Sequence, residues 1–183
     1  MEYYSAEDIE EMKRNGYENE TIAKARAIQE KADELISIIA RAFEGVTLEN
    51  GVGLDEAQAI DDYKTLEQRK LQRSNDEKEN WQNILVSELN RCNSSLSFFD
   101  AKGMRFHLPA FMIADVKNQY KFGMSFCLTS LSDYSTDMFS LFTQEQREAV
   151  RCFLNYAYNS PEYEFENNLI ADALLGFWHE ERE

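Results

Sequence analysis

The sequence predicts an α+β fold that is mostly helical, with a small antiparallel β-hairpin or three-stranded sheet packed against helices. The chain of 183 residues has only 2 prolines and 7 glycines, which favours long regular elements over a loop-rich sandwich or barrel. Apolar residues recur at helical spacing near both ends of the chain. In the middle, two stretches alternate apolar and polar residues, as half-buried strands do.

The hairpin is predicted within the stretch Phe98–Met112, which reads FFDAKGMRFHLPAFM. Asp100 stands three positions before Gly103, a spacing typical of a type I turn closed by a left-handed residue. Apolar residues alternate on both sides of that turn. Residues 122–129 alternate in the same way and predict a third strand. The apolar positions of the three strands are Leu96, Phe98, Met104, Phe106, Phe122, Met124, Phe126 and Leu128.

Proline and capping signals predict the helices. Pro109 suits the first position of a helix and pushes Leu108 into an extended conformation, so we expect a helix from about Pro109 to Asn118. Thr143 with Gln146 forms a capping box that opens another helix. The remaining helices are expected over residues 19–44, 55–64 and 84–92 and from Ser160-Pro161 onward, with Gly45 ending the first and longest of them. Residues 64–83 are densely and evenly charged and are expected to form a solvated helix or loop anchored by Trp81.

The expected organisation is an acidic N-terminal arm over residues 1–18, with at most a short helix, followed by a single α+β domain over residues 19–183. A chain of this length can bury one sizeable core. Its composition, 43% hydrophobic and 13% aromatic, is not that of a disordered protein.

Charge favours one class of partner over others. The net charge is −15, with 16 acidic and 6 basic residues in positions 1–63, 10 and 11 in 64–147, and 8 and 2 in 148–183. Nucleic acid and an anionic membrane surface are disfavoured, because both require clustered positive charge. A basic protein partner fits. The alternative is that the acidic residues only keep the protein soluble.

The sequence predicts a cytoplasmic protein without a cofactor or metal. The N-terminal segment has no apolar core of a signal peptide, and no apolar run is long enough to cross a membrane. The chain has three widely spaced cysteines, Cys92, Cys127 and Cys152. An odd number at this spacing favours reduced, buried thiols over disulfides. With two histidines and no Cys or His at ligand spacing, a structural zinc site is not expected.

Four segments carry a resemblance: Gly51–Tyr63, Trp81 with Leu89, Phe98–Met112 and Leu141–Tyr156. Their most specific part is the signature GMRF-x-LPAFM. On these segments the chain resembles an uncharacterised bacterial family described only as a domain of unknown function, over about residues 35–158. The resemblance implies a bacterial origin and carries no active site or ligand.

The densest carboxylate group, at the start of residues 55–64, could hold Mg²⁺ or divide acid and base roles. Its members are Asp55, Glu56, Asp61 and Asp62. On a helix at most two of these side chains converge, and Asp55 is expected to cap that helix. A surface for a basic partner, or a solvated helix face, is therefore the preferred interpretation.

Two further candidates come from the hairpin and the C-terminal region. Arg105 and His107 would share one face of the hairpin, where His107 could meet Cys127 as a Cys-His dyad. Arg105 is expected to pair with Asp100 or a helix C-terminus. Near the C-terminus, acidic residues surround several aromatics, a combination found both in protein interfaces and in ordinary cores. These acidic candidates are Glu162, Glu164 and Glu166.

The expected function is therefore non-enzymatic binding of a basic protein partner through an acidic surface. Its sharpest version is an immunity-type inhibitor that covers the cationic active site of a toxin or effector. The alternatives are a carboxylate-based, Mg-dependent enzyme of unknown substrate and a nucleic-acid mimic. The sequence does not predict the oligomeric state.

Overall fold

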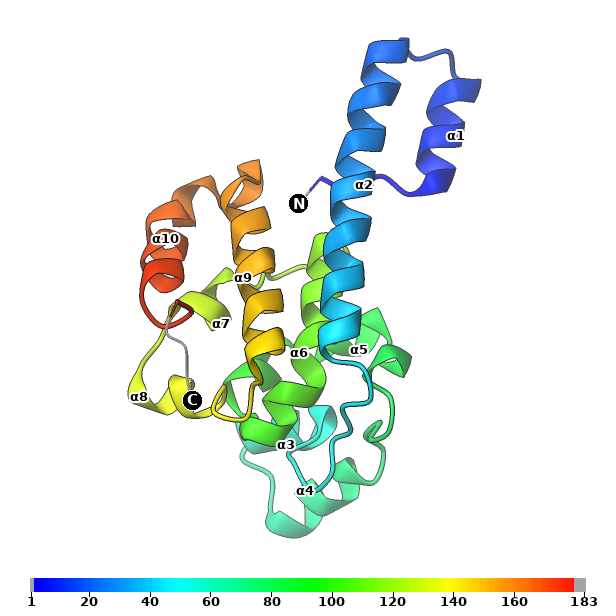
Figure 1. Cartoon of the computed structure of the whole chain (residues 1–183). Helices are drawn as coiled ribbons and strands as arrows, with labels where there is room; N and C mark the ends of the chain where they lie inside the picture. The colour runs from blue at the N-terminus through cyan, green and yellow to red at the C-terminus, as the bar shows by residue number, and fades with distance from the viewer. Residues whose placement is uncertain (1, 180–183) are drawn as a thin grey trace.

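The structure is a computed structural model and describes residues 2–179. Within those residues the chain forms only helices, joined by turns and connectors (Figure 1). The α+β prediction is therefore wrong, since neither a hairpin nor a sheet occurs in the described chain. The α-helices and 3₁₀-helices (η) are α1 (Ala6–Arg14), α2 (Asn19–Ala42), α3 (Leu54–Asp61), α4 (Leu66–Arg73), η1 (Trp81–Asn83), α5 (Val86–Arg91), η2 (Asn93–Ser97), α6 (Ala101–Val116), α7 (Ser125–Thr129), α8 (Asp133–Asp137), α9 (Gln144–Tyr158), η3 (Pro161–Glu166) and α10 (Asn167–Leu175).

The stretch predicted as a hairpin forms the first half of helix α6. The Asp100 side chain caps this helix by accepting a hydrogen bond from the N–H of Gly103 at 2.7 Å. An Asp that starts a turn and an Asp that caps a helix use the same local hydrogen bond. The spacing of Asp100 and Gly103 therefore marks the start of a helix here.

Burial explains why the alternation in α6 was misleading. Twelve of its sixteen residues are buried, so the helix is enclosed on nearly every side. A helix in this position has no polar face, and its sequence shows no apolar stripe at helical spacing. Met104 and Phe106 are buried on either side of the partly buried Arg105, which fitted the period of a strand without requiring one.

Pro109 lies inside α6 and does not begin it. A proline at this position leaves the carbonyl of Arg105 without its usual helical donor, at a cost of about 3 kcal/mol in an ordinary helix interior. Leu108 and Phe111, on either side of Pro109, are fully buried. We attribute the continuation of the helix to this packing, which outweighs the local preference of the proline.

The predicted third strand is a turn followed by the short helix α7. Gly123 has a positive φ of 71°, which breaks any extended path through residues 122–129. Met124 then donates its N–H to the hydroxyl oxygen of Tyr163 at 2.9 Å. Met124 and Leu128 are buried, whereas Phe122 and Phe126 are 59% and 76% exposed. The alternating apolar residues thus do not form one buried face.

The helices expected from apolar stripes and caps are present. α2 begins at Asn19 and is followed by Gly45 with a φ of 71°. Thr143 and Gln146 form the predicted capping box of α9. α2 contacts both α6 and α9, and Figure 1 shows these three helices running side by side through the centre of the molecule.

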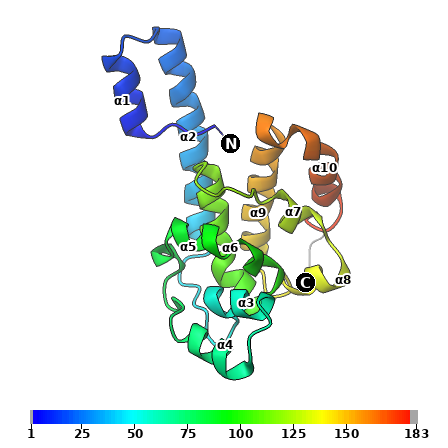
Figure 2. The same ribbon diagram turned by 180° about the vertical axis from the view of Figure 1, so that it is seen from behind.

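The N-terminal region forms a helical hairpin that extends beyond the rest of the molecule (Figures 1 and 2). Residues 6–14 of the predicted arm form α1, which packs on the first half of α2. Its contact has a small apolar cluster of its own, made by Ile9, Ile22 and Ala25. Helices α3 and α4 lie at the opposite end of the molecule, and α5 lies beside α6 (Figure 2). Asn90 of α5 makes hydrogen bonds with Gln119 and Lys121, just after α6.

Candidate functional site

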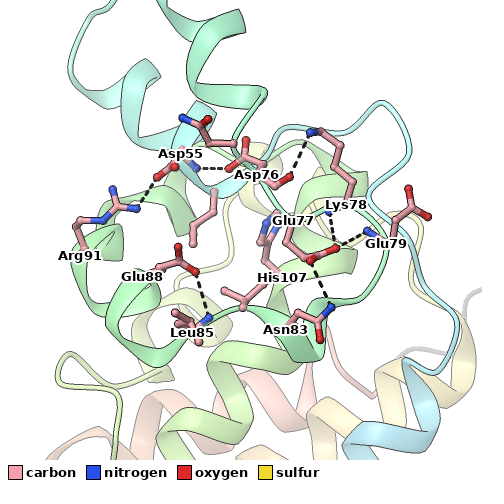
Figure 3. Close-up of a pocket in the computed structure, with 13 residues that line it drawn as sticks. Asp55, Asp76, Glu77, Lys78, Glu79, Asn83, Leu85, Glu88, Arg91 and His107 are labelled. Atoms are coloured by element: carbon pink, nitrogen blue, oxygen red, sulfur yellow. Dashed lines mark hydrogen bonds and ion pairs between the residues drawn. The ribbon is translucent and has the colours of Figure 1, made fainter.

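A pocket of about 590 Å³ lies at the end of the molecule formed by α3, α5 and the connector that follows α4 (Figure 3). Five carboxylates and two basic side chains contribute to its wall. We call it the acidic pocket, and its lining residues are Leu54, Asp55, Asn75, Asp76, Glu77, Lys78, Glu79, Asn83, Ile84, Leu85, Glu88, Arg91 and His107.

Asp76 joins the α4–η1 connector to the start of α3. Its carboxylate accepts hydrogen bonds from the N–H groups of Asp55 at 2.7 Å and Glu56 at 3.4 Å. The helix N-cap is Gly53, which has no side chain to make this bond, so Asp76 supplies the cap from a distant part of the chain. Burial raises the pKa of Asp76 to about 6.

Asp55 does not cap α3 as predicted but lies in its first turn. Its carboxylate makes an ion pair with Arg91 of α5 at 2.6 Å. This bond, visible in Figure 3, crosses from α3 to α5 at the edge of the acidic pocket. Asp55 is thus the one member of the predicted carboxylate group that lines the pocket.

Glu77 is held by the backbone of the residues that follow it. Its carboxylate accepts from the N–H groups of Lys78, Glu79 and Asn80 at 2.9, 2.8 and 3.1 Å. The hydrogen bonds from Glu79 and Asn80 are the chief reason that the pKa of Glu77 lies below its ordinary value. Across the pocket, Glu88 accepts from the N–H of Leu85 at 3.2 Å. Both carboxylates are therefore fixed in place before any ligand arrives.

His107 closes the acidic pocket from the side of α6 (Figure 3). Its side chain is buried, and its ring stacks on Phe99 with 4.4 Å between ring centroids and meets the edge of Phe106 at 4.9 Å. Nδ1 lies 2.7 Å from the carbonyl oxygen of Gly103. Burial lowers the pKa of His107 to about 4, so the imidazole is neutral at pH 7.

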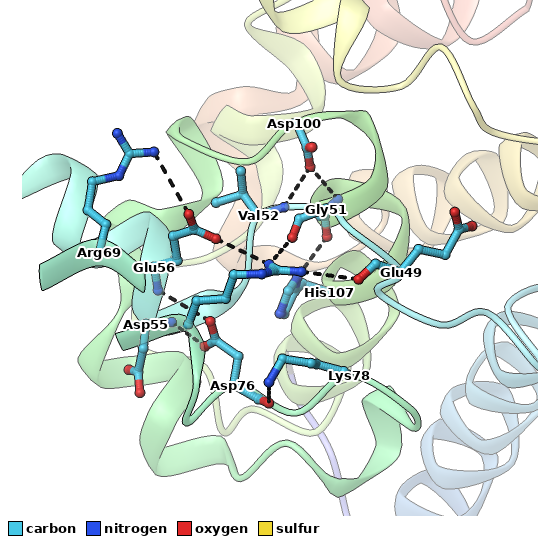
Figure 4. A network of polar contacts seen from close by, with 12 residues as sticks. Glu49, Gly51, Val52, Asp55, Glu56, Arg69, Asp76, Lys78, Asp100 and His107 are labelled. Carbon is cyan, nitrogen blue, oxygen red and sulfur yellow. Dashed lines mark hydrogen bonds and ion pairs between the residues drawn. The ribbon is translucent and has the colours of Figure 1, made fainter. Parts of the chain in front are cut away.

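The glycine-rich connector between α2 and α3 packs against the start of α6 (Figure 4). Asp100 accepts from the N–H of Val52 at 2.9 Å as well as from Gly103. A Cβ on Gly51 would lie 2.6 Å from Cβ of Lys102, too close for any side chain. This close approach of two backbones sets the position of α6, and hence of His107, relative to α3.

Arg73 of α4 ties the same connector to α3 through its guanidinium. Its guanidinium donates to the carbonyl oxygens of Glu49 at 3.1 Å and of Gly51, and to the Glu56 carboxylate at 3.2 Å. Glu56 also has Arg69 at 3.9 Å. The side chain of Glu56 therefore has a structural role between α3 and α4 and does not line the acidic pocket.

The other members of the predicted carboxylate group lie at the far end of α3. Asp61 and Asp62 receive hydrogen bonds from Gln58 at 3.5 and 3.2 Å. Among the described residues no group of three or more His, Cys, Asp or Glu side chains is arranged to hold a metal ion. The four predicted carboxylates are thus divided between three separate sets of contacts.

Arg105 and His107 do not share a face as predicted, because two residues apart on a helix point in nearly opposite directions. Arg105 donates from Nε to Gln146 at 3.1 Å, which replaces the expected pairing with Asp100. The proposed dyad of His107 with Cys127 depended on two paired strands that do not exist. Cys127 lies on α7 and borders a different pocket.

The C-terminal carboxylates are remote from the acidic pocket. Glu162, Glu164 and Glu166 belong to η3, which Figure 1 shows at the other end of the molecule from α3 and α4. Glu162 and Glu166 accept hydrogen bonds from Ser160 and Ser125. The structure therefore brings Asp55 and His107 together in one pocket and leaves the other predicted residues outside it.

Four acidic residues of the pocket were missed by the sequence analysis: Asp76, Glu77, Glu79 and Glu88. Three of them lie in the evenly charged stretch 64–83, which was interpreted as a solvated helix or loop. The available signal was the acidic sequence Asp76-Glu77-Lys78-Glu79 shortly before Trp81, a tryptophan predicted to anchor this segment. Trp81 is indeed buried and donates from Nε1 to the carbonyl oxygen of Phe43 at 2.9 Å.

The fold and the acidic pocket thus define an all-helical protein, within residues 2–179, with a preformed cavity at one end. The chain belongs to a protein family described as a family of unknown function, DUF6714, whose model matches residues 31–182. Neither the curated proteins nor the solved structures include a match to the chain. The family match begins within α2, so α1 lies outside it. No helix in the described part of the chain has the length and apolar character needed to cross a membrane.

Proposed function

We propose that this protein is a non-enzymatic binding protein whose acidic pocket receives a basic segment of a partner protein. The observation that carries the proposal is the charge of the pocket wall: Asp55, Asp76, Glu77, Glu79 and Glu88 face the same cavity as only Lys78 and Arg91. Such a wall attracts a cationic segment and speeds its encounter with the protein.

The contacts within the pocket support binding over catalysis. Asp55 is engaged by Arg91, Asp76 by the start of α3, and Glu77 by three backbone N–H groups. Carboxylates held in this way present fixed negative charge. The Mg-dependent alternative has no comparable support, because its four carboxylates make separate contacts with Arg91, Arg73 and Gln58.

The finer form of the proposal is an immunity-type inhibitor that acts in a bacterial cytoplasm and covers a basic toxin or effector. The net charge of −15 supports a basic protein over a nucleic acid as the partner. Cys92, Cys127 and Cys152 are all free thiols, as is usual in a reducing compartment.

The experiment is capture of partners by the immobilised full-length protein from an extract of its source organism, at low and at high salt. The variant is Glu79→Gln with Glu88→Gln, and the matched control is Glu20→Gln with Glu164→Gln, which removes the same charge far from the pocket. We expect a basic protein to be retained at low salt and released at high salt.

Loss of two attractive charges in the pocket should weaken retention of that protein by roughly tenfold or more, because close interfacial charge pairs couple by about 1.5 kcal/mol upward. The control variant should retain the partner like the wild type. Retention that is equal in both variants, or a retained partner that is acidic, would contradict the proposal.

A further inference from the structure

We infer that the acidic pocket recognises one arginine side chain of the partner, whose guanidinium donates a hydrogen bond to Nε2 of His107. This inference rests on the proposed function and specifies its chemistry. It requires an acceptor at the base of the pocket, apolar walls for the stem of the arginine, and carboxylates for its charge.

The acceptor follows from the contact between His107 and Gly103. A carbonyl oxygen can only accept a hydrogen bond, so the proton of the neutral ring must be on Nδ1, 2.7 Å from the oxygen of Gly103. Nε2 therefore carries a lone pair. The stack of the ring on Phe99 and its edge contact with Phe106 fix the direction of that lone pair.

Nε2 has no hydrogen-bond partner among the residues that the structure describes, although the His107 side chain is 99% buried, with a relative exposure of 1%. Nε2 is not among the completely buried polar atoms that lack a partner in the described chain, so it keeps a small exposure, and His107 borders the acidic pocket (Figure 3). A ligand that enters the pocket can therefore replace water at Nε2.

The surroundings of His107 select a cation that carries N–H donors. An anion would meet five carboxylates, and a ligand with only acceptors would leave Nε2 unsatisfied. Leu54, Ile84 and Leu85 provide apolar walls for a methylene stem or for the flat face of a guanidinium.

Arginine suits the pocket better than lysine because its acceptors lie in different directions. A guanidinium offers five N–H donors in a rigid plane and can serve an imidazole nitrogen and a carboxylate together. Glu88 has one oxygen engaged by Leu85, and Glu79 lies on the opposite side of the pocket (Figure 3). A lysine ammonium would reach fewer of these groups at once.

The test uses the full-length protein labelled with ¹⁵N and the nitrogen resonances of His107. The probes are blocked Gly-Arg-Gly, Gly-Lys-Gly and Gly-citrulline-Gly, together with agmatine. Citrulline has the shape of arginine without the charge, and agmatine is a free small cation with the same guanidinium. We expect the arginine peptide to bind, to shift Nε2 far more than Nδ1, and to exceed the citrulline peptide in affinity by about tenfold or more.

Replacement of the acceptor provides the second arm. His107→Phe keeps an aromatic ring against Phe99 but removes Nε2. This substitution should lower the affinity for the arginine peptide by about tenfold. Glu164→Gln in η3 is the control and should leave the affinity unchanged. Should His107→Phe fail to fold, as judged by circular dichroism, the comparison of arginine with citrulline on the wild type still decides the question.

The outcomes separate the inference from the proposed function. Equal binding of the arginine and lysine peptides with an unmoved Nε2 overturns the inference, while salt-dependent capture of a basic partner would still stand. Agmatine that binds more tightly than the peptide overturns the assignment to a protein side chain in favour of a free small cation. Failure of capture together with failure of every peptide overturns both.

Discussion

The hydroxyl of Tyr163 donates a hydrogen bond to the carboxylate of Asp115, and both side chains are buried although 48 residues separate them in the chain. This contact joins η3 to the last turns of α6. Tyr163 also accepts from the N–H of Met124. The segment between α6 and α7 is thus attached to the C-terminal helices through one phenol.

This contact predicts a pH-dependent stability. Burial raises the pKa of Asp115 to about 6, above its ordinary value of 3.8. A raised folded-state pKa means that the folded protein binds more protons between these values, so the contribution of Asp115 to stability is complete below pH 3.8 and is lost as pH rises through 6.

The variant Asp115→Asn keeps an oxygen for Tyr163 and removes the titration. Its stability relative to the wild type should therefore be most favourable at pH 7 and should decline by on the order of 1–3 kcal/mol as the pH falls to about 4. Urea unfolding at several pH values measures this difference. Asp76 and His107 also contribute to the pH dependence of stability, Asp76 in the same direction as Asp115 and His107 in the opposite direction. Both contributions are present in the variant and in the wild type, so they cancel when the wild-type curve is subtracted. A difference that does not vary with pH would show that Asp115 is not the group responsible.

The second prediction concerns Gly53 and Asp76. A Cβ on Gly53 would overlap the carboxylate of Asp76, so Gly53→Ala should destabilise the protein, by at least 1–3 kcal/mol on the usual scale of forced overpacking. Asp76→Ala removes the cap of α3 and should cost about 1–2 kcal/mol by itself.

In the double variant the overlap is absent. Its loss of stability should therefore be smaller than the sum of the losses in the two single variants. A double-mutant cycle by thermal unfolding measures this coupling, which we expect to exceed 0.5 kcal/mol, about the limit within which independent sites add. Simple additivity would contradict the contact. Glu164→Ala, an exposed change in η3, serves as the control for scatter between variants.

The third prediction concerns Gly103. Glycine to alanine in a helix normally stabilises by about 0.8–1 kcal/mol. At Gly103 the added Cβ would collide with the carbonyl oxygen of Val52, so the sign should reverse and the variant should unfold at a lower denaturant concentration than the wild type. A gain in stability on this substitution would mean that the glycine-rich connector does not rest on α6 as described.

The fourth prediction concerns Trp81, the buried anchor of the connector that carries Asp76. Trp81→Phe leaves an aromatic ring and removes the donor to the carbonyl oxygen of Phe43. That carbonyl would then lack this partner, at a cost of about 1–3 kcal/mol. Denaturant unfolding followed by circular dichroism tests this, and unchanged stability would assign the role of Trp81 to packing alone.

Local signals predicted those helices that have one apolar face. α2 and α9 were found from apolar stripes, Gly45 and the Thr143 cap. α6 was missed because burial on nearly all sides erases the helical period, and because Asp100 and Gly103 suit a turn as well as a cap. The existence of helix was thus predictable where a helix faces water, and not where it lies in the core.

The acidic pocket could not be predicted because its parts meet only through the fold. Asp76 and Asp55 are 21 residues apart and are joined by a backbone cap that no local pattern announces. His107 was singled out, but on the premise of an exposed strand face. The charge counts did not point to the pocket, because the middle of the chain, with 10 acidic and 11 basic residues, supplies four of the five pocket carboxylates.

The three hydrogen bonds that hold the Glu77 carboxylate lower the free-energy cost of binding a cation. Three backbone amides take the place of much of the water that would otherwise surround its charge. The N–H groups that solvate this carboxylate are therefore already in place, and they need not be rearranged or immobilised when a cation binds. Folding has already met the entropic cost of orienting this charge, so more of the attraction remains as affinity.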